Sequence, residues 1–335
     1  MIGQRTEIWK KDEYSYPAAY GFIPLMVSYV HEDRKIRPAM IVVPGGAYRY
    51  ASPSEGDIVA RQFYSAGYNV FVLAYTVNYL GDEPLGLQPL RDISRTVRII
   101  RLHAEECRID PSKIVVCGFS AGGHLCASLC VHYKDIDDCR PEYDAVSNRP
   151  DAAILAYPVI NSGKYANRES FLALLGEKAS QKDLEYMSLE NHVTEDTPPC
   201  FLWQTATDDS VPVENSCLFA RACKTAGVPY AHHIFTDGVH GMSVANEAWL
   251  EGKNRDSYTL EQIVKLADAI QNGETGYPPE KGSEILRERG LSGEPREKWS
   301  PEMKEWLRTV LPEVGMWPEM ARRWLERILD TAAAV

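Results

Sequence analysis

One stretch constrains the fold of this chain more than any other: Ile-Val-Val-Cys-Gly-Phe-Ser-Ala-Gly-Gly-His, at residues 114–124. Its four leading apolar residues predict a short strand buried on both faces, and the run at 124–131 predicts a helix. Between them, residues 118–122 fit the G-x-S-x-G pattern, a sharp strand-to-helix turn that leaves a serine hydroxyl projecting above the sheet. Side chains two residues before and after the serine would clash in such a turn, which explains the glycines. We therefore interpret Ser120 as a nucleophile rather than an ordinary helix-cap serine.

Apolar strand-like runs alternate with helical patterns over most of the chain. After a leader that we expect to form a hairpin within residues 1–38, strands are predicted at 39–43, 69–75, 114–117, 152–157, 200–205 and 230–235. Helices are predicted at 54–66, 90–107, 124–131 and 213–226, with short ones near 171–175 and 182–187. This alternation predicts an α/β fold with a mostly parallel sheet covered by helices on both faces.

Composition narrows the class of protein. The chain has 335 residues, 44% of them hydrophobic, and no Gly/Ser/Pro-rich linker interrupts the first 250, which favours one core. A formal net charge of −11 argues against nucleic acid or an anionic membrane as a partner. The eight cysteines form no C-x-x-C pair and indicate buried free thiols. With no apolar leader or 18-residue apolar run, we expect a cytoplasmic protein, although a chain whose leader had been removed would read the same.

Two later strand-like runs each lead into a polar loop. The run at 200–205 leads to Asp208 and Asp209, and the run at 230–235 leads to His240. A serine nucleophile needs a base to take its proton, and the base needs a carboxylate to hold its tautomer. Each of these residues could be an ordinary loop residue if considered alone. Because serine, acid and histidine each follow a strand in the order such folds require, we predict that they form a catalytic triad.

Other histidines are expected to have different roles. His124 lies one helical turn after the serine and is expected to pack locally rather than act as the base. His232 and His233 are neighbours in a strand, so they point to opposite faces and cannot bind one ion together. We expect neither a metal nor a cofactor.

These segments resemble α/β-hydrolase esterases of the acetyl-xylan-esterase-like group, and more distantly hormone-sensitive-lipase-type esterases and the prolyl oligopeptidase catalytic domain. The resemblance covers about residues 25–245, with a further match at 317–327. The motifs that carry it are Val43-Pro44-Gly45-Gly46-Ala47-Tyr48, Ser54-Glu55-Gly56, Gly118-Phe119-Ser120-Ala121-Gly122-Gly123-His124-Leu125, Arg149-Pro150-Asp151 with Tyr157-Pro158-Val159, Asp208-Asp209-Ser210-Val211-Pro212-Val213, and His240-Gly241.

The resemblance implies roles for individual residues. The family pattern D-x-x-V-P selects Asp208 rather than Asp209 as the acid. It also implies an oxyanion hole built from the backbone amides of Ala121, Gly46 and Ala47. Many relatives have histidine at the position of Pro44 and a third glycine at that of Ala47, so this alanine is expected to serve only if its φ is negative.

The surroundings of the predicted site are less constrained. Residues 44–50 form a loop with two glycines, which we call the glycine loop. Tyr48 and Arg49 lie in it and Glu55 lies beyond it, and all three are candidates for the pocket wall or for purely structural roles. Residues 246–315 interrupt the family pattern before a terminal helix at 317–330. We expect them to be a mostly helical elaboration of a single α/β-hydrolase domain (1–335). They would form either a lid or acceptor-binding wall, or a surface or dimerisation appendage.

The expected function is hydrolysis of short-chain carboxylic esters, implied by the resemblance to act on acetyl groups of carbohydrate such as xylan or an oligosaccharide. Alternatives are a feruloyl or aryl esterase, an amidase, or a catalytically silent binding protein with the same fold. The expected partner is a small-molecule or oligosaccharide ester, with no nucleic acid and no membrane. A homo-oligomer is compatible with the sequence.

Overall fold

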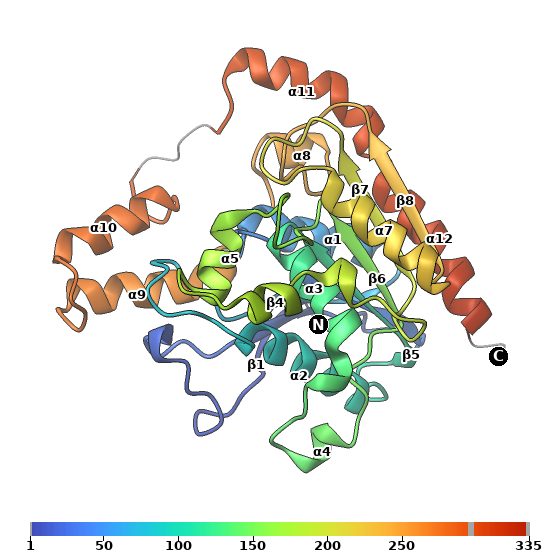
Figure 1. Ribbon diagram of the computed structural model, residues 1–335, viewed down its shortest axis with the longest axis horizontal. Coiled ribbons are helices and arrows are strands. Elements are labelled where there is room, and N and C mark those ends of the chain that lie inside the picture. Colours follow the sequence, from blue (N-terminus) through green and yellow to red (C-terminus); the bar gives the residue numbers. More distant parts are fainter. Residues whose placement is uncertain (1, 294–297, 333–335) are drawn as a thin grey trace.

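Eight strands form one sheet in the spatial order β1-β2-β4-β3-β5-β6-β7-β8 (Figure 1). The computed structural model describes residues 2–293 and 298–332. β1 and β2 are antiparallel to their neighbours, and the other strands run parallel to one another. The mostly parallel sheet predicted from the alternating pattern is therefore confirmed. The strands are β1 (Ile2–Glu7), β2 (Leu25–Tyr29), β3 (Arg37–Val43), β4 (Asn69–Ala74), β5 (Ile109–Phe119), β6 (Ala152–Ala156), β7 (Cys200–Thr205) and β8 (Tyr230–Phe235).

Helices cover both faces of the sheet (Figure 1). The long helices expected before residue 230 are present, and the first of them begins after a 3-10 turn at Pro53–Glu55. The α-helices are α1 (Asp57–Ser65), α2 (Gln88–Leu102), α3 (Ala121–His132), α4 (Pro141–Asp144), α5 (Arg168–Leu175), α6 (Gln181–Tyr186), α7 (Glu214–Ala226), α8 (Glu247–Leu250), α9 (Glu261–Gln271), α10 (Pro279–Glu288), α11 (Pro301–Val314) and α12 (Trp317–Ala332).

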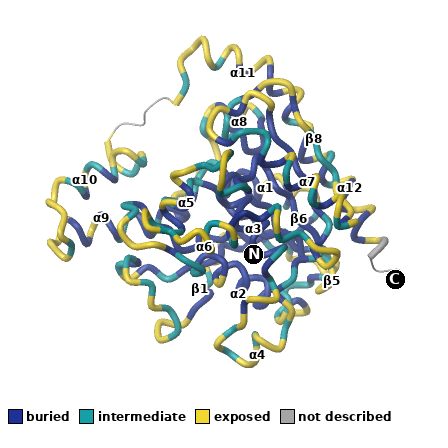
Figure 2. Tube along the Cα trace, in the orientation of Figure 1, coloured by how far each residue is buried: buried dark blue, intermediate teal, exposed yellow. Residues whose placement is uncertain are grey.

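The central strands are buried on both sides, as their continuous apolar runs predict. In β3, Ile41 and Val43 belong to the core under α2, α3, α7 and α9, whereas Met40 and Val42 belong to the core under α1, α11 and α12. All four are inaccessible to solvent. Alternate side chains of a strand point to opposite faces, so one run of apolar residues supplies both cores. Figure 2 shows this buried centre, with exposed chain concentrated in peripheral segments such as α4, α10 and α11.

Helix α9 is attached to the core by hydrogen bonds and by apolar packing. The Gln262 side chain accepts a hydrogen bond from the Val77 amide (2.9 Å) and donates one to the Val77 carbonyl (2.7 Å). Ile263 and Ile270 are buried against the same core as α2 and α3. Helix α10 then packs on α9 so closely that a Cβ at Gly282 would lie 2.6 Å from the Ala267 carbonyl oxygen.

The last helix reaches back to the loop that follows β8. The Trp317 indole stacks on Trp203 of β7, with ring centroids 5.2 Å apart, and donates a hydrogen bond to the Ser243 carbonyl (2.8 Å). Within residues 2–293 and 298–332, no helix combines the length and apolar character that crossing a bilayer requires.

Candidate active site

The turn between β5 and α3 holds Ser120 in a backbone conformation, φ 53° and ψ −117°, that residues other than glycine rarely adopt. The flanking glycines permit it. A Cβ at Gly118 would lie 2.2 Å from the Gly122 carbonyl oxygen, and a Cβ at Gly122 would lie 2.1 Å from the Val43 carbonyl oxygen. Neither obstacle is a flexible side chain, so any residue larger than glycine would force the turn to open. The hydroxyl is thereby presented at the carboxyl end of the sheet.

Three residues predicted from separate strand ends meet at this turn. His240 Nε2 lies 2.8 Å from Ser120 Oγ, and His240 Nδ1 lies 2.7 Å from Asp208 Oδ2. They follow β8, β5 and β7 respectively, whose carboxyl ends share one edge of the sheet. With Nδ1 protonated and donating to Asp208, Nε2 is free to accept the serine proton. This geometry is suited to nucleophilic catalysis by the serine.

Of the two adjacent aspartates, the structure places Asp208 against the histidine. Its carboxylate is fully buried, and its second oxygen accepts hydrogen bonds from the Ser210 amide (3.0 Å) and the Val211 amide (2.9 Å). Asp209 is exposed and contacts the Ser210 hydroxyl. The D-x-x-V-P spacing thus has a physical reason: the turn before Pro212 caps the carboxylate and orients it.

The glycine loop approaches the serine closely, because a Cβ at Gly45 would lie 2.8 Å from the Ser120 Cβ. Gly46 and Ala47 line the cavity above Ser120, and their N–H groups have no acceptor among the residues that the structure describes. Ala121 begins α3, where the first amides of a helix lack intrahelical partners. A Cβ at Gly46 would lie 2.1 Å from the Tyr50 carbonyl oxygen, so only glycine fits there. These three amides are the ones that the family resemblance implies for an oxyanion hole.

The negative φ that we set as a condition for Ala47 is not found, but its N–H group has no acceptor among the described residues and stays available as a donor. Ala47 has φ 55° and Tyr48 has φ 59°, so two successive residues with side chains are left-handed. This conformation costs roughly 1–2 kcal/mol per residue because Cβ approaches the following carbonyl oxygen. The surrounding contacts must therefore hold the loop in place.

Glu55 provides one of those contacts from a buried position. Its Oε2 accepts a hydrogen bond from the Gly45 amide (2.8 Å), and its Oε1 accepts one from the Tyr157 hydroxyl (2.7 Å). The Tyr157 oxygen in turn accepts a hydrogen bond from the Ser243 amide (3.1 Å). Burial raises the pKa of Glu55, and the two hydrogen bonds to its carboxylate oppose that rise. Glu55 thus joins the glycine loop to the loop that carries His240.

Tyr48 lies outside the cavity, contrary to our expectation for the pocket. The left-handed backbone turns its side chain inward, where it is buried and its hydroxyl lies 2.8 Å from His124 Nδ1. The other ring nitrogen of His124 lies 3.0 Å from the Met187 carbonyl oxygen, and burial lowers the pKa of His124 to about 4. His124 thus packs locally, as expected. The nearby aromatic residue that does line the cavity is Tyr50.

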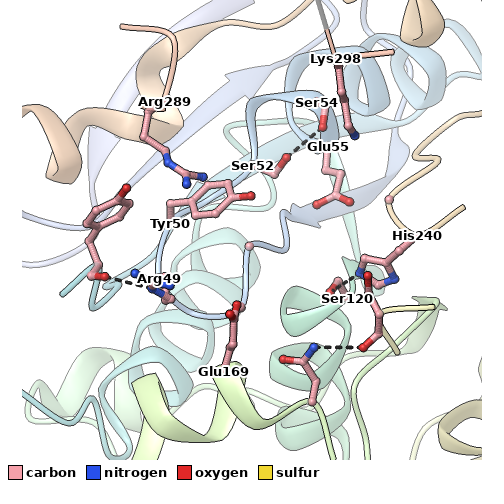
Figure 3. Close-up of a pocket in the computed structure, with 16 residues that line it drawn as sticks. Arg49, Tyr50, Ser52, Ser54, Glu55, Ser120, Glu169, His240, Arg289 and Lys298 are labelled. Atoms are coloured by element: carbon pink, nitrogen blue, oxygen red, sulfur yellow. Dashed lines mark hydrogen bonds between the residues drawn. The ribbon is translucent and has the colours of Figure 1, made fainter. Parts of the chain in front are cut away.

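The cavity above Ser120 has a volume of about 500 Å³ and polar walls (Figure 3). Arg49 and Glu55 line it, as expected. Our sequence reasoning missed several other lining residues: Tyr50, Ser52, Ser54, Tyr79, Asn167, Glu169, Ser210, Gly241, Arg289 and Lys298. Asn167 and Glu169 lie at the start of α5, whereas Arg289 and Lys298 come from the segment 246–315. No motif marks these last four residues, because only the packing of distant segments brings them to the site.

Among residues 2–293 and 298–332, no group of three or more His, Cys, Asp or Glu side chains is placed to hold a metal ion. The described site brings a serine, a histidine and an aspartate together in a geometry that acyl transfer by a serine can use.

Comparison with known proteins identifies a family model and curated relatives that match this chain. Residues 27–223 match the family model described as BD-FAE, which covers more than half of the chain. Endo-1,4-beta-xylanase B of Butyrivibrio fibrisolvens is 47% identical over 266 residues, which are 79% of this chain and 42% of that protein. Acetylxylan esterase of Xylanibacter ruminicola is 30% identical over 223 residues, covering 65% of this chain and 43% of that protein. The chain thus spans less than half the length of these two curated relatives.

Solved structures show the same relationship over most of this chain. The acetyl ester-xyloside bifunctional hydrolase from Caldicellulosiruptor lactoaceticus has a TM-score of 0.68 and 34% identity, covering 87% of this chain and 98% of that one. The carboxylesterase Cest-2923 from Lactobacillus plantarum has a TM-score of 0.61 and 25% identity, covering 88% and 100%. These similarities confirm the resemblance found in the sequence. The chain has the α/β-hydrolase fold and belongs to the BD-FAE family.

Proposed function

We propose that this chain is a serine carboxylesterase that removes short acyl groups, in particular acetyl groups, from carbohydrate esters. The observation that carries the proposal is the continuous chain of contacts from Asp208 through His240 to Ser120 at the floor of a polar cavity. The choice of an acetylated carbohydrate is supported by two relatives, one named acetylxylan esterase and the other an acetyl ester-xyloside hydrolase.

In the proposed reaction, Ser120 Oγ attacks the ester carbonyl carbon while His240 Nε2 takes the hydroxyl proton. The Asp208 carboxylate balances the imidazolium. The amides of Gly46, Ala47 and Ala121 donate hydrogen bonds to the oxyanion. His240 then gives the proton to the departing sugar oxygen as the carbonyl–oxygen bond breaks. A water molecule, activated by the same histidine, attacks the acyl-enzyme and releases the acid.

The mechanism is tested by Ser120→Ala. Removing the nucleophile should lower kcat on p-nitrophenyl acetate by on the order of 10⁶ and abolish labelling by a fluorophosphonate probe. A matched control is Ser112→Ala, which changes an exposed serine on the same strand and should leave both readouts unchanged. Retention of activity in the Ser120 variant would contradict the mechanism. Failure of the unmodified chain to label would favour a silent binding protein.

The acyl group is tested by a substrate series. Rates on acetyl, butyryl and feruloyl esters and on an anilide should be highest for acetyl. The polar walls offer few apolar contacts to a longer chain or an aromatic acyl group. A higher kcat/KM for the feruloyl ester or the anilide would overturn the acetyl preference while leaving the serine mechanism intact.

A further inference from the structure

Two arginine side chains meet on the cavity wall across from Ser120 and His240 (Figure 3). Arg49 comes from the glycine loop, and Arg289 follows the last residue of α10. Their guanidinium carbons lie 5.4 Å and 5.3 Å from the centre of the same ring, that of Tyr79. The Arg289 guanidinium also lies 4.3 Å from the centre of the Tyr50 ring. We call Arg49 and Arg289 the arginine pair.

The arginine pair carries two positive charges with no ion pair to a carboxylate among the described residues. Arg49 Nε donates to the Tyr79 carbonyl (3.0 Å). Arg289 Nε is buried and has no hydrogen-bond partner within the described part of the chain. A buried donor without a partner costs about 1–3 kcal/mol. Two positive charges beside the same Tyr79 ring also repel one another, so an anion within reach of both would relieve both penalties.

The carboxylates near the arginine pair neutralise only part of its charge. Glu288 accepts a hydrogen bond from the Tyr79 hydroxyl (2.7 Å). That bond and the charges of Lys281, Arg289 and Arg49 hold the pKa of Glu288 below its usual value. Lys281 is itself paired with Glu284 at 2.9 Å. Glu288 thus offsets one of the two arginine charges, and one positive charge remains for a ligand.

Besides His240 and the arginine pair, the charged residues that line the cavity are Glu55, Glu169 and Lys298. The Glu55 carboxylate accepts hydrogen bonds from the Gly45 amide and the Tyr157 hydroxyl. Lys298 adds a further cation to the lining. Glu169 projects into the cavity from α5 (Figure 3). A carboxylate there can accept hydrogen bonds from sugar hydroxyls but repels an anion, so a negatively charged group is favoured at the arginine pair.

From this arrangement we propose that the arginine pair binds a carboxylate on the sugar part of the ester. The preferred substrate is then an acylated acidic carbohydrate, such as one that contains a uronic acid. Arginine suits this role because its planar fork of donors matches a carboxylate. The inference rests on the proposed esterase function, since the acyl group must lie at Ser120 while the carboxylate lies at the arginine pair.

The test compares two esters that differ in one group: O-acetylated methyl glucoside and O-acetylated methyl glucuronoside, which carries a carboxylate at C6. For the unmodified protein, kcat/KM should be about tenfold higher for the glucuronoside, mainly through KM, since one charge-assisted contact contributes that much. The ratio should fall as salt is raised. Equal values for the two esters would overturn the proposal, as would a higher value for the corresponding 6-phosphate.

Arg289→Gln and Arg49→Gln should each bring this ratio close to one. Arg287→Gln is the matched control because Arg287 lies on the same helix, is exposed and does not line the cavity. It should keep the ratio of the unmodified protein. An unchanged ratio in Arg289→Gln would contradict the assignment.

Two further measurements do not depend on those variants or on turnover. D-glucuronate should inhibit hydrolysis of p-nitrophenyl acetate competitively at concentrations where D-glucose does not, and equal inhibition would overturn the proposal. Calorimetry with the Ser120→Ala variant should show binding of D-glucuronate over D-glucose even if no ester is cleaved. Failure of the esterase proposal and failure of the carboxylate site would therefore be seen separately.

Discussion

The two ends of the active-site cavity are built in different ways. The end that holds Ser120, Asp208 and His240 consists of loops that follow β5, β7 and β8 of one mostly parallel sheet. The opposite end is made of side chains from helices and their flanking loops, including Glu169 from α5 and Arg289 after α10. The first end inherits its geometry from the hydrogen-bonded sheet, whereas the second depends on how later segments pack around it. In the proposed function, the first end would cleave the ester and the second would recognise the sugar, with the glycine loop contributing Arg49 to the second end.

The sharpest way to test this separation is a change that disables the chemical end for every substrate. Asp208→Asn should lower kcat on all esters by on the order of 10⁴, because the amide would stabilise the wrong histidine tautomer. Asp209→Asn is the neighbouring control and should have kcat values like those of the unmodified chain, since Asp209 is exposed. Steady-state kinetics on p-nitrophenyl acetate and on both acetylated sugars measure the effect. If kcat fell only for the charged sugar ester, the two ends of the cavity would not have separate roles.

A second test concerns the contacts behind the chemical end. Glu55→Ala would leave the Gly45 amide and the Tyr157 hydroxyl without their acceptor, at a cost of about 2–5 kcal/mol in the free energy of unfolding. Because the glycine loop would shift, kcat should fall about 10²-fold. Urea unfolding and kinetics, with the exposed Glu177→Ala as control, give both numbers. If kcat were unchanged, Glu55 would not position the oxyanion loop.

The pH dependence of stability provides a finer readout of the same residue. Since burial raises the pKa of Glu55, the folded chain keeps that proton to a higher pH than the unfolded chain does. The stabilisation that protonated Glu55 contributes is complete at pH values below its pKa in the unfolded chain, about 4.3. It is lost as the pH rises through the pKa of Glu55 in the folded chain. Glu55→Gln should therefore be less stable than the unmodified chain at low pH, with the gap narrowing as pH increases. A gap that widened with pH would contradict the sign of the shift.

The smallest expected effect concerns the left-handed alanine of the glycine loop. Ala47→Gly should stabilise the fold by up to about 1 kcal/mol, because glycine adopts φ 55° without strain. Ala51→Gly, at a buried position outside the left-handed turn, should destabilise it by about 0.5–1 kcal/mol. Chemical denaturation of the two variants should thus give shifts of opposite sign. A loss of stability in both would mean that the turn carries little strain.

The same division separates what could be predicted from the sequence and what could not. The strands could be predicted because buried parallel strands are continuous apolar runs, and the order of Ser120, Asp208 and His240 followed from which strand each one ends. The roles of Gly118 and Gly122 could be predicted because the clash that they avoid lies within the strand-to-helix turn and its immediate surroundings. Positions at the sheet edge are therefore well determined by pattern alone.

The sequence offered the opposite wall only as one of two alternatives for residues 246–315, and the individual side chains could not be predicted, for physical reasons. In α10 only Gly282 and Ile285 are buried, so the helix has no apolar stripe, and the stretch around it is rich in Gly, Pro and charge. Its place is determined by the close approach of Gly282 to α9, which no local pattern reveals. The direction of Tyr48 was likewise misjudged, because two left-handed residues reverse the loop there. Both features arise from tertiary packing and not from propensity.

The contact between Trp317 and the loop after β8 has a consequence for biosynthesis. During translation the nucleophile, the acid and the histidine all emerge before the tryptophan that packs on Trp203 and binds the Ser243 carbonyl. A nascent chain that has exposed every residue up to the histidine loop therefore still lacks the indole that supports it. The packing behind this loop can therefore be completed only after Trp317 has left the ribosome.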